Sequence, residues 1–527
     1  MKILLKNIKI IRKIKIILNL KTKNSNMKKH NLMSGALVLS VGSVLAKVFS
    51  AIYRIVLTRI LGGEGIGLYQ LIFPFYSLCV VLTTAGLTMA ISKVVSKHKG
   101  KEIGVLKKCL LFSALVALTI TFVLVVFSGG LAALQGEKKL TTCYLILSTT
   151  ILFVSSSSVL RGYFQGKHNF IPSSVSNIFE QFVKLCVGLI LSVSLISAGL
   201  IPAIIGAVIG IVFSEVVSLL ILLFYLKREK IESKTKVDIS IKELTKDIIP
   251  ITLNNIVLPI STFIDSVLVV NLLSKNFSQS MSVFLYGLES GAVSSLVSIP
   301  TIFSFAIASV ILPNLTSSKN RFNRSVKLTI SLKIILIIAV PCVIAFALVP
   351  NRIIEFLYHG RLNSYGVNGI VIASRLLAIS SFGIIFLAIN QVYTSSLQAV
   401  DERFVAVRNL TIAVVVKFVI ELLFLPSKML NIYALATANT LCYLTAFILN
   451  HLEIRNNFNI NIKFSFWCKL VLSNCIMLIA LILIMMLNVG SVNTMLAVIV
   501  AIIAYFSCLF MTNILSSKDK AMIKYKV

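Results

Sequence analysis

The sequence predicts an all-α membrane protein that crosses the bilayer about fourteen times. Of its 527 residues, 57% are hydrophobic, whereas a soluble domain is usually about 45–50% apolar. The mean hydropathy is +0.96. Apolar runs of about 20 residues recur along the whole chain, and each could cross about 30 Å of hydrocarbon as a helix. The sequence lacks the short alternating strands of a transmembrane barrel.

Charged segments divide the expected spans into groups of six, six and two. We expect spans at 34–57, 68–92, 109–128, 140–164, 172–198, 204–226, 249–273, 282–312, 328–349, 367–395, 406–424, 431–452, 466–487 and 493–514. The domains predicted from this grouping are a basic N-terminal extension (1–33), a first lobe (34–226), a linker (227–248), a second lobe (249–452), two last spans (453–515) and a tail (516–527).

The net charge of +33 follows the expected topology. Most of the 51 lysines and arginines fall between spans on one side, above all in 1–33, 93–108 and 227–248. This positive-inside bias predicts a cytoplasmic-membrane protein with both termini in the cytoplasm. Attraction to anionic membrane lipids explains the charge, so we expect no nucleic-acid partner.

The first 26 residues alternate Ile and Leu with Lys and show no small-residue cleavage site, which argues against a signal peptide. They form either a basic amphipathic helix on the inner leaflet or a dispensable extension upstream of a start at Met27. We favour the dispensable extension.

The sequence motifs do not indicate a soluble enzyme or a metal site. The nine cysteines form no CxxC pair and lie mostly within spans, and the five histidines are scattered. No Walker loop, GxSxG or HExxH motif occurs. We therefore predict neither an enzyme nor a metal or cofactor site, apart from a coupling ion, Na⁺ or H⁺, which the sequence does not identify.

Two recurring patterns indicate that the two lobes are repeats. Leu-Tyr opens both the second and the eighth span, at Tyr69 and Tyr286. A glutamine precedes a lysine by nineteen residues in both lobes, in the pairs Gln165–Lys184 and Gln398–Lys417. Each lobe starts on the same side of the membrane, so the repeat is parallel.

Charged residues inside the spans mark the candidate site, because a charge at mid-membrane costs about 2.5–3.5 kcal/mol unless it faces a cavity or a partner. Arg161, Lys333 and Lys469 are expected to reach water at span ends. The full set is Lys47, Arg54, Arg161, Glu180, Lys184, Glu215, Asp265, Glu289, Lys333, Arg375, Lys417, Glu421 and Lys469.

Two pairs in this set have the i,i+4 spacing at which side chains on a helix meet. Glu180 precedes Lys184, and Lys417 precedes Glu421. Either both pairs are self-neutralised and structural, or the cations line a cavity that holds an anionic substrate. Asp265 stands alone, which indicates either cation coupling or a salt bridge to the other lobe.

Two long motifs carry a family resemblance. SGALVLSVGSVLAKVFSAIYRIVLTRILGGEGIGLYQLIFPFYSL and LRGYFQGKHNFIPSSVSNIFEQFVKL resemble the stage V sporulation protein B family, in the polysaccharide-exporter branch of the multidrug/oligosaccharidyl-lipid/polysaccharide superfamily. Lipid II flippases and O-antigen flippases are relatives. The resemblance runs from about Met27 to the C-terminus, and the second half matches only in general pattern.

The resemblance implies fourteen helices, with two six-helix lobes in a V around a central cavity. It also implies alternating access and a lipid-tail groove formed by the last two helices. Carried over by motif, the cavity residues are Arg54 and Arg59 in YRIVLTRILG and Glu180 and Lys184 in EQFVK. The family often has arginine at position 184. The in-membrane charges add Asp265 and Lys417 as candidate cavity residues.

The predicted function is a flippase for a polyprenyl-pyrophosphate-linked glycan, such as a peptidoglycan or spore-cortex precursor, working beside cell-wall synthesis machinery. Converging Lys and Arg in a low-dielectric site suit a pyrophosphate. A multidrug antiporter would need an acidic, aromatic-rich cavity, and a membrane glycosyltransferase or polymerase would need a sizeable acidic outer loop. A non-transporting assembly factor of sporulation stays open.

Overall fold

The structure, a computed structural model, describes residues 30–98, 102–229, 241–316, 318, 320–486, 490–516 and 519. The predicted extension therefore falls largely, and the linker and tail partly, outside the described residues. Within the described ranges the chain is helical, and its one β-type pairing is an isolated bridge between Ser364 and Val367.

The first half of the chain forms one helix group. Its elements are α2 (His30–Lys97), α3 (Glu102–Leu134), η1 (Lys138–Leu140), α4 (Thr141–Ser148), α5 (Thr150–Gly166), α6 (Ile171–Leu195), η2 (Ile196–Ala198) and α7 (Leu200–Arg228).

The second half continues with α8 (Ile241–Leu273), α9 (Gln279–Gly287), η3 (Leu288–Val293), α10 (Ser294–Thr316), α11 (Arg321–Leu348), α12 (Pro350–Tyr358), α13 (Gly369–Ala399), α14 (Arg403–Phe424), α15 (Tyr433–Asn457), α16 (Phe464–Met486) and α17 (Gly490–Met511). Each of the fourteen predicted spans overlaps one of these helices or a chain of consecutive ones.

Ten segments of the described chain are long and apolar enough to cross a membrane. One of them, Val38–Lys97, contains two predicted spans. The stretch α14 is not among the ten because charged residues interrupt it, among them Lys417 and Glu421. The all-α membrane fold is confirmed.

The chain reverses inside α2 at Gly62, where the sequence predicted a loop. Gly62 has a φ of 69°, in the left-handed region that glycine adopts without steric cost. A straight helix of 68 residues would be about 100 Å long. Instead, Arg54 lies 5.6 Å from the ring centre of Phe73, nineteen positions later, so the two halves of α2 run back past each other.

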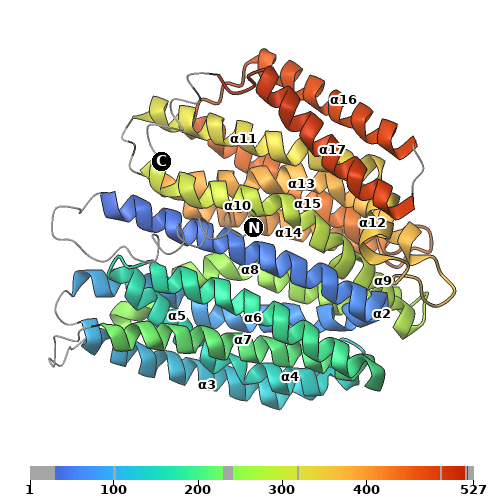
Figure 1. Cartoon of the computed structure of the whole chain (residues 1–527). Coiled ribbons are helices and arrows are strands. Elements are labelled where there is room, and N and C mark those ends of the chain that lie inside the picture. Colours follow the sequence, from blue (N-terminus) through green and yellow to red (C-terminus); the bar gives the residue numbers. More distant parts are fainter. Residues whose placement is uncertain are drawn as a thin grey trace, which may run out of the picture.

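The helices pack as two bundles that meet along α2 and α8 (Figure 1). In one bundle α2 packs on α5 and α6, α6 on α7, and α3 on α5. In the other, α13 packs on α10, α11 and α15, and α14 on α15. The pair α16 and α17 lies at the edge of the second bundle, where α16 contacts α11.

The two bundles touch at both ends of the molecule. At one end lies a glycine contact of Gly63 and Gly67 on α2 with Gly287 and Gly291 on the other bundle. A Cβ added to Gly67 or Gly287 would lie closer than 3.0 Å to the opposite backbone. At the other end, the Ser40 hydroxyl lies 3.0 Å from that of Ser309.

Candidate central cavity

A cavity of about 290 Å³ lies between the two bundles. Side chains of α2 line one wall, and side chains of α8, η3, α14 and α15 line the others. Of the six predicted site residues, Arg54, Asp265 and Lys417 line it directly. The cavity therefore brings together charges that are more than 350 positions apart in sequence.

The α2 side of the cavity is cationic. Arg54 lies over the ring of Phe73, and the Lys184 ammonium lies 5.0 Å from the centre of the same ring and 5.2 Å from that of Tyr53. Such contacts stabilise a cation by about 0.5–2 kcal/mol and leave its charge in place. Among the described residues, no carboxylate lies within the 4.0 Å ion-pair distance of Arg54 or Lys184. We call Arg54, Lys184, Tyr53 and Phe73 the cationic wall; of these, Arg54 and Phe73 line the cavity, and Lys184 and Tyr53 lie behind them.

Glu180 binds a different partner from the one its spacing predicts. Its carboxylate accepts a hydrogen bond of 2.6 Å from Arg161 on the preceding helix α5. Arg161 also donates to the Ser218 hydroxyl at 2.7 Å. The alternative in which Glu180 and Lys184 neutralise each other is not what the structure shows, and the expectation that Arg161 reaches water is wrong, because α5 turns its arginine toward α6.

The second-lobe pair does form as its spacing predicts. Lys417 lies 3.6 Å from the Glu421 carboxylate. It also donates to Asp265 on α8, and all three side chains are buried. The partner of Asp265 thus lies in its own lobe and not, as one alternative held, in the other.

Glu289 is a fourth member of this buried group that motif reasoning left out of the site. It stands in η3, a π-helical turn inside the eighth predicted span, and accepts a hydrogen bond of 3.1 Å from Ser380. Such π-bulges are frequent at functional sites. The one signal in the sequence was a carboxylate within an apolar helix. In the same turn the Ser290 carbonyl accepts from Gln70 of α2 at 2.7 Å, a bond between the bundles.

Asp265, Glu289, Lys417 and Glu421 form what we call the acidic cluster. Three carboxylates face one ammonium, and one oxygen each of Asp265 and Glu289 and both of Glu421 have no hydrogen-bond donor in the part of the chain that the structure describes. The described residues contain no metal-binding group of three or more such side chains. Buried carboxylates in excess of their cation favour uptake of a proton or a small cation.

Arg59 does not join the site. Its side chain is exposed, one helical turn beyond Arg54 toward the end of the helix, and it does not line the cavity. Glu215 on α7 lies near Glu180, and the side chains of both residues are half-buried.

A scan of family models matches residues 32–319 to the polysaccharide biosynthesis protein family. The chain is 28% identical over 326 residues to the uncharacterized membrane protein YabM and 26% identical over 302 residues to stage V sporulation protein B, both of Bacillus subtilis. These matches cover 59% and 54% of this chain and span only 61% and 58% of those relatives. The lipid II flippase MurJ of the same organism is 23% identical over 81% of this chain and 83% of its own.

Solved structures share the fold. A lipid II flippase MurJ in an inward closed conformation superposes with a TM-score of 0.68, at 18% identity, over 91% of this chain and 99% of the flippase. An inward-facing multidrug transporter of the MATE family, in the MOP superfamily, gives 0.63 at 16% identity, over 80% and 98%. The chain thus has the all-α fold of these transporters, as predicted. Because the family model matches more than half of the sequence, the chain belongs to the polysaccharide biosynthesis protein family.

Proposed function

We propose that the protein is a flippase that moves a polyprenyl-pyrophosphate-linked glycan across the membrane. The observation that carries the proposal is the cationic wall, where no carboxylate of the described residues lies within ion-pair distance of Arg54 or Lys184. A pyrophosphate supplies the missing negative charge, and charge-assisted hydrogen bonds are the strong ones in such a setting.

In this mechanism the headgroup enters between the bundles and contacts Arg54 and Lys184. The first lobe (34–226) and the second lobe (249–452) then rock about the cavity, so that one end contact opens while the other closes. The glycine contact and the Ser40–Ser309 contact are the two closures. The polyprenyl chain stays in lipid, beside α16 and α17. No bond is made or broken, so the protein acts as a transporter and not as an enzyme.

The acidic cluster supplies the coupling in this proposal. Its surplus of carboxylates over Lys417 takes up a proton or Na⁺, which changes the charge of the second lobe without touching the cationic wall. Transport then depends on a pH or Na⁺ gradient, and replacing Glu421 with glutamine removes that dependence.

Liposomes that contain a fluorescent polyprenyl-pyrophosphate sugar test the proposal. The wild type should make the inner-leaflet sugar accessible to an outer quencher, and Arg54→Ala should not. Arg59→Ala is the matched control, because it removes a nearby arginine that does not line the cavity. Equal activity in both variants would contradict the assignment of the cationic wall.

Organic-cation export is the second candidate, and the acidic cluster favours it. A cationic drug would bind Asp265 and Glu289 across the aromatic Tyr286 and Tyr443, which also line the cavity. Ethidium efflux from proteoliposomes under a proton gradient distinguishes the two functions. Efflux without sugar flipping would establish the antiporter.

We further propose that the protein resides in the cytoplasmic membrane with both termini inside and functions with cell-wall synthesis machinery. Reporter fusions at Lys138 and Lys428 should then read as exterior. Fusions at Lys236 and Lys520 should read as cytoplasmic. A cytoplasmic signal at Lys138 would overturn the topology of the first lobe.

A further inference from the structure

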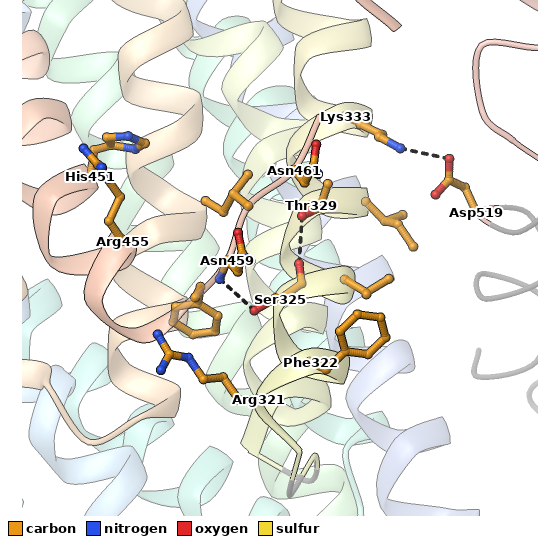
Figure 2. Close-up of a pocket in the computed structure, with 14 residues that line it drawn as sticks. Arg321, Phe322, Ser325, Thr329, Lys333, His451, Arg455, Asn459, Asn461 and Asp519 are labelled. Atoms are coloured by element: carbon orange, nitrogen blue, oxygen red, sulfur yellow. Dashed lines mark hydrogen bonds and ion pairs between the residues drawn. The ribbon is translucent and has the colours of Figure 1, made fainter. Parts of the chain in front are cut away.

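Two lysines that the sequence places inside the spans have different partners. Lys333 on α11 binds the Asp519 carboxylate at 3.0 Å, on the wall of a cavity of about 970 Å³ that is lined by residues of the second half of the chain (Figure 2). Lys47 on α2 has no carboxylate within the 4.0 Å ion-pair distance among the described residues. Its ammonium instead lies 3.7 Å from the centre of the Phe305 ring on α10. The partner of Lys47 is therefore an aromatic ring.

The contact of Lys47 with Phe305 joins the two bundles. The other cations that lie over aromatic rings in the described part of the chain face a ring of their own half. Lys47 follows Ser40 by seven residues, on the same face of α2. Phe305 precedes Ser309 by four residues, on the same face of α10. The serine contact and the lysine contact are therefore neighbours, at the end of the molecule opposite the glycine contact.

Lys47 also lies between this closure and the central cavity. Arg54, which lines the cavity, follows Lys47 by seven residues on the same face of α2, a distance of about 10 Å along a helix. The Phe305 ring is 37% exposed and the Lys47 side chain is half-buried, so the contact is not sealed. An anion that enters from the end of the Ser40–Ser309 contact thus meets Lys47 before it meets Arg54.

We propose that Lys47 and Phe305 form a latch that the anionic headgroup of the substrate opens. The latch presupposes the flippase function proposed above and orders its steps. Phosphate oxygens hold a cation more strongly than an aromatic ring does, because charge-assisted hydrogen bonds are stronger than contacts with the face of a ring. A phosphate group at this end therefore draws Lys47 away from Phe305, and the contact between α2 and α10 is lost there.

The latch acts through the difference between a closed and an open state. A contact between a cation and a ring requires a separation of at most about 6 Å, so moving α10 away from α2 breaks it. A ligand that binds Lys47 only in the open state shifts the equilibrium toward that state. When the headgroup moves on to Arg54, Lys47 returns to Phe305 and closes this end behind the substrate.

Disulfide formation in the double variant Ser40→Cys, Ser309→Cys measures closure at this end, because the two serine hydroxyls lie 3.0 Å apart. The purified full-length variant is oxidised in detergent, and mass spectrometry of the linked peptides gives the initial rate. Sodium pyrophosphate is the anionic probe, and sodium chloride of equal ionic strength is its control. Pyrophosphate should slow the reaction about threefold or more and chloride should not, since the loss of one cation–ring contact changes an equilibrium by a few-fold.

Further changes in this cysteine background identify the latch. Phe305→Leu should by itself slow disulfide formation about threefold, because the ring contact is lost. Phe303→Leu is the matched control, since Phe303 is also exposed on α10 but lies over no cation in the part of the chain that the structure describes, and it should leave the rate unchanged. Lys47→Met should abolish the effect of pyrophosphate. Lys47→Arg should retain it, because arginine also binds rings and phosphates.

Equal rates in Phe305→Leu and Phe303→Leu, or an undiminished pyrophosphate effect in Lys47→Met, would overturn the latch. Lys47→Arg guards against misfolding, because it keeps the charge and the ring contact, and loss of the pyrophosphate effect in this variant would also contradict the latch. Sugar flipping in liposomes combined with a disulfide rate that pyrophosphate does not change would refute the latch alone. A pyrophosphate-sensitive rate without sugar flipping would support the latch and refute the flippase function.

Discussion

Lys184 and Lys417 each follow a glutamine by nineteen residues, one in the first half of the chain and one in the second, yet their surroundings differ in sign. Lys417 is buried between Asp265 and Glu421. Lys184 lies over two aromatic rings, one of which, that of Phe73, it shares with Arg54. The charge beside each lysine differs because α2 supplies Arg54 and α8 supplies Asp265.

This difference separates a structural lysine from one that can bind a ligand. A lysine already neutralised by carboxylates must lose them before it can attract an anion. A lysine held by aromatic rings pays a desolvation cost without receiving a full counter-charge, and an incoming anion recovers that cost. The first half of the chain thus presents a cationic wall, and the second half presents the acidic cluster.

The largest expected effect comes from Lys417→Met. It leaves three buried carboxylates without a cation and should lower the free energy of unfolding by about 3–5 kcal/mol. Fluorescence-detected thermal unfolding and expression level measure this loss. Adding Asp265→Asn should recover part of it, and Lys184→Met should cost much less. If the two lysine variants lose equal stability, the contrast between the lobes is wrong.

Lys184→Ala should act on transport instead of stability. Losing one desolvated charge contact to a pyrophosphate corresponds to about 2–3 kcal/mol, so flipping should fall by about thirtyfold or more at normal expression. Lys184→Arg keeps the charge and should retain transport. Full activity of the alanine variant would show that the cationic wall does not contact the substrate.

Glu180→Gln tests the ion pair between Arg161 and Glu180 in the first lobe. It leaves Arg161 without its carboxylate and should lower stability by about 2 kcal/mol, since each charge-assisted hydrogen bond is worth about 1.5–3 kcal/mol. The double variant Arg161→Met, Glu180→Gln should regain stability and keep Lys184-dependent flipping. Failure of flipping in a stable double variant would place Glu180 or Arg161 in the transport site after all.

The smallest expected effect is that of Phe73→Leu, which removes the ring shared by Arg54 and Lys184. Cation–π contacts of about 0.5–2 kcal/mol predict a change of a few-fold in the substrate concentration needed for half-maximal flipping. Phe75 offers the control, because its ring packs on Phe263 and Tyr144 and not on a cation. Equal effects of Phe73→Leu and Phe75→Leu would mean that packing alone is affected.

Hydropathy and charge were enough to predict the spans, because apolar length is a property of each segment by itself. The Lys417–Glu421 contact was predictable for the same reason, since it lies within one helix. The partners of Glu180 and Asp265 were not predictable, because Arg161 and Lys417 come from other helices. Helix rotation decides which side chains meet, and no local pattern records it. At Gly62 the sequence predicted a loop of several residues, whereas a single left-handed glycine reverses the chain.

The glycine contact has a mechanical consequence. At Gly67 and Gly287 the two main chains lie in direct contact, and the side chains of Ile66, Phe284 and Leu288 pack against the neighbouring glycines. Separating the bundles there exposes buried apolar side chains and breaks the hydrogen bond from Gln70 to the Ser290 carbonyl, so opening this end has a free-energy cost. The contact also depends on the absence of side chains, because a methyl group added at Gly67 or Gly287 would lie closer than 3.0 Å to the opposite backbone and would hold the bundles apart.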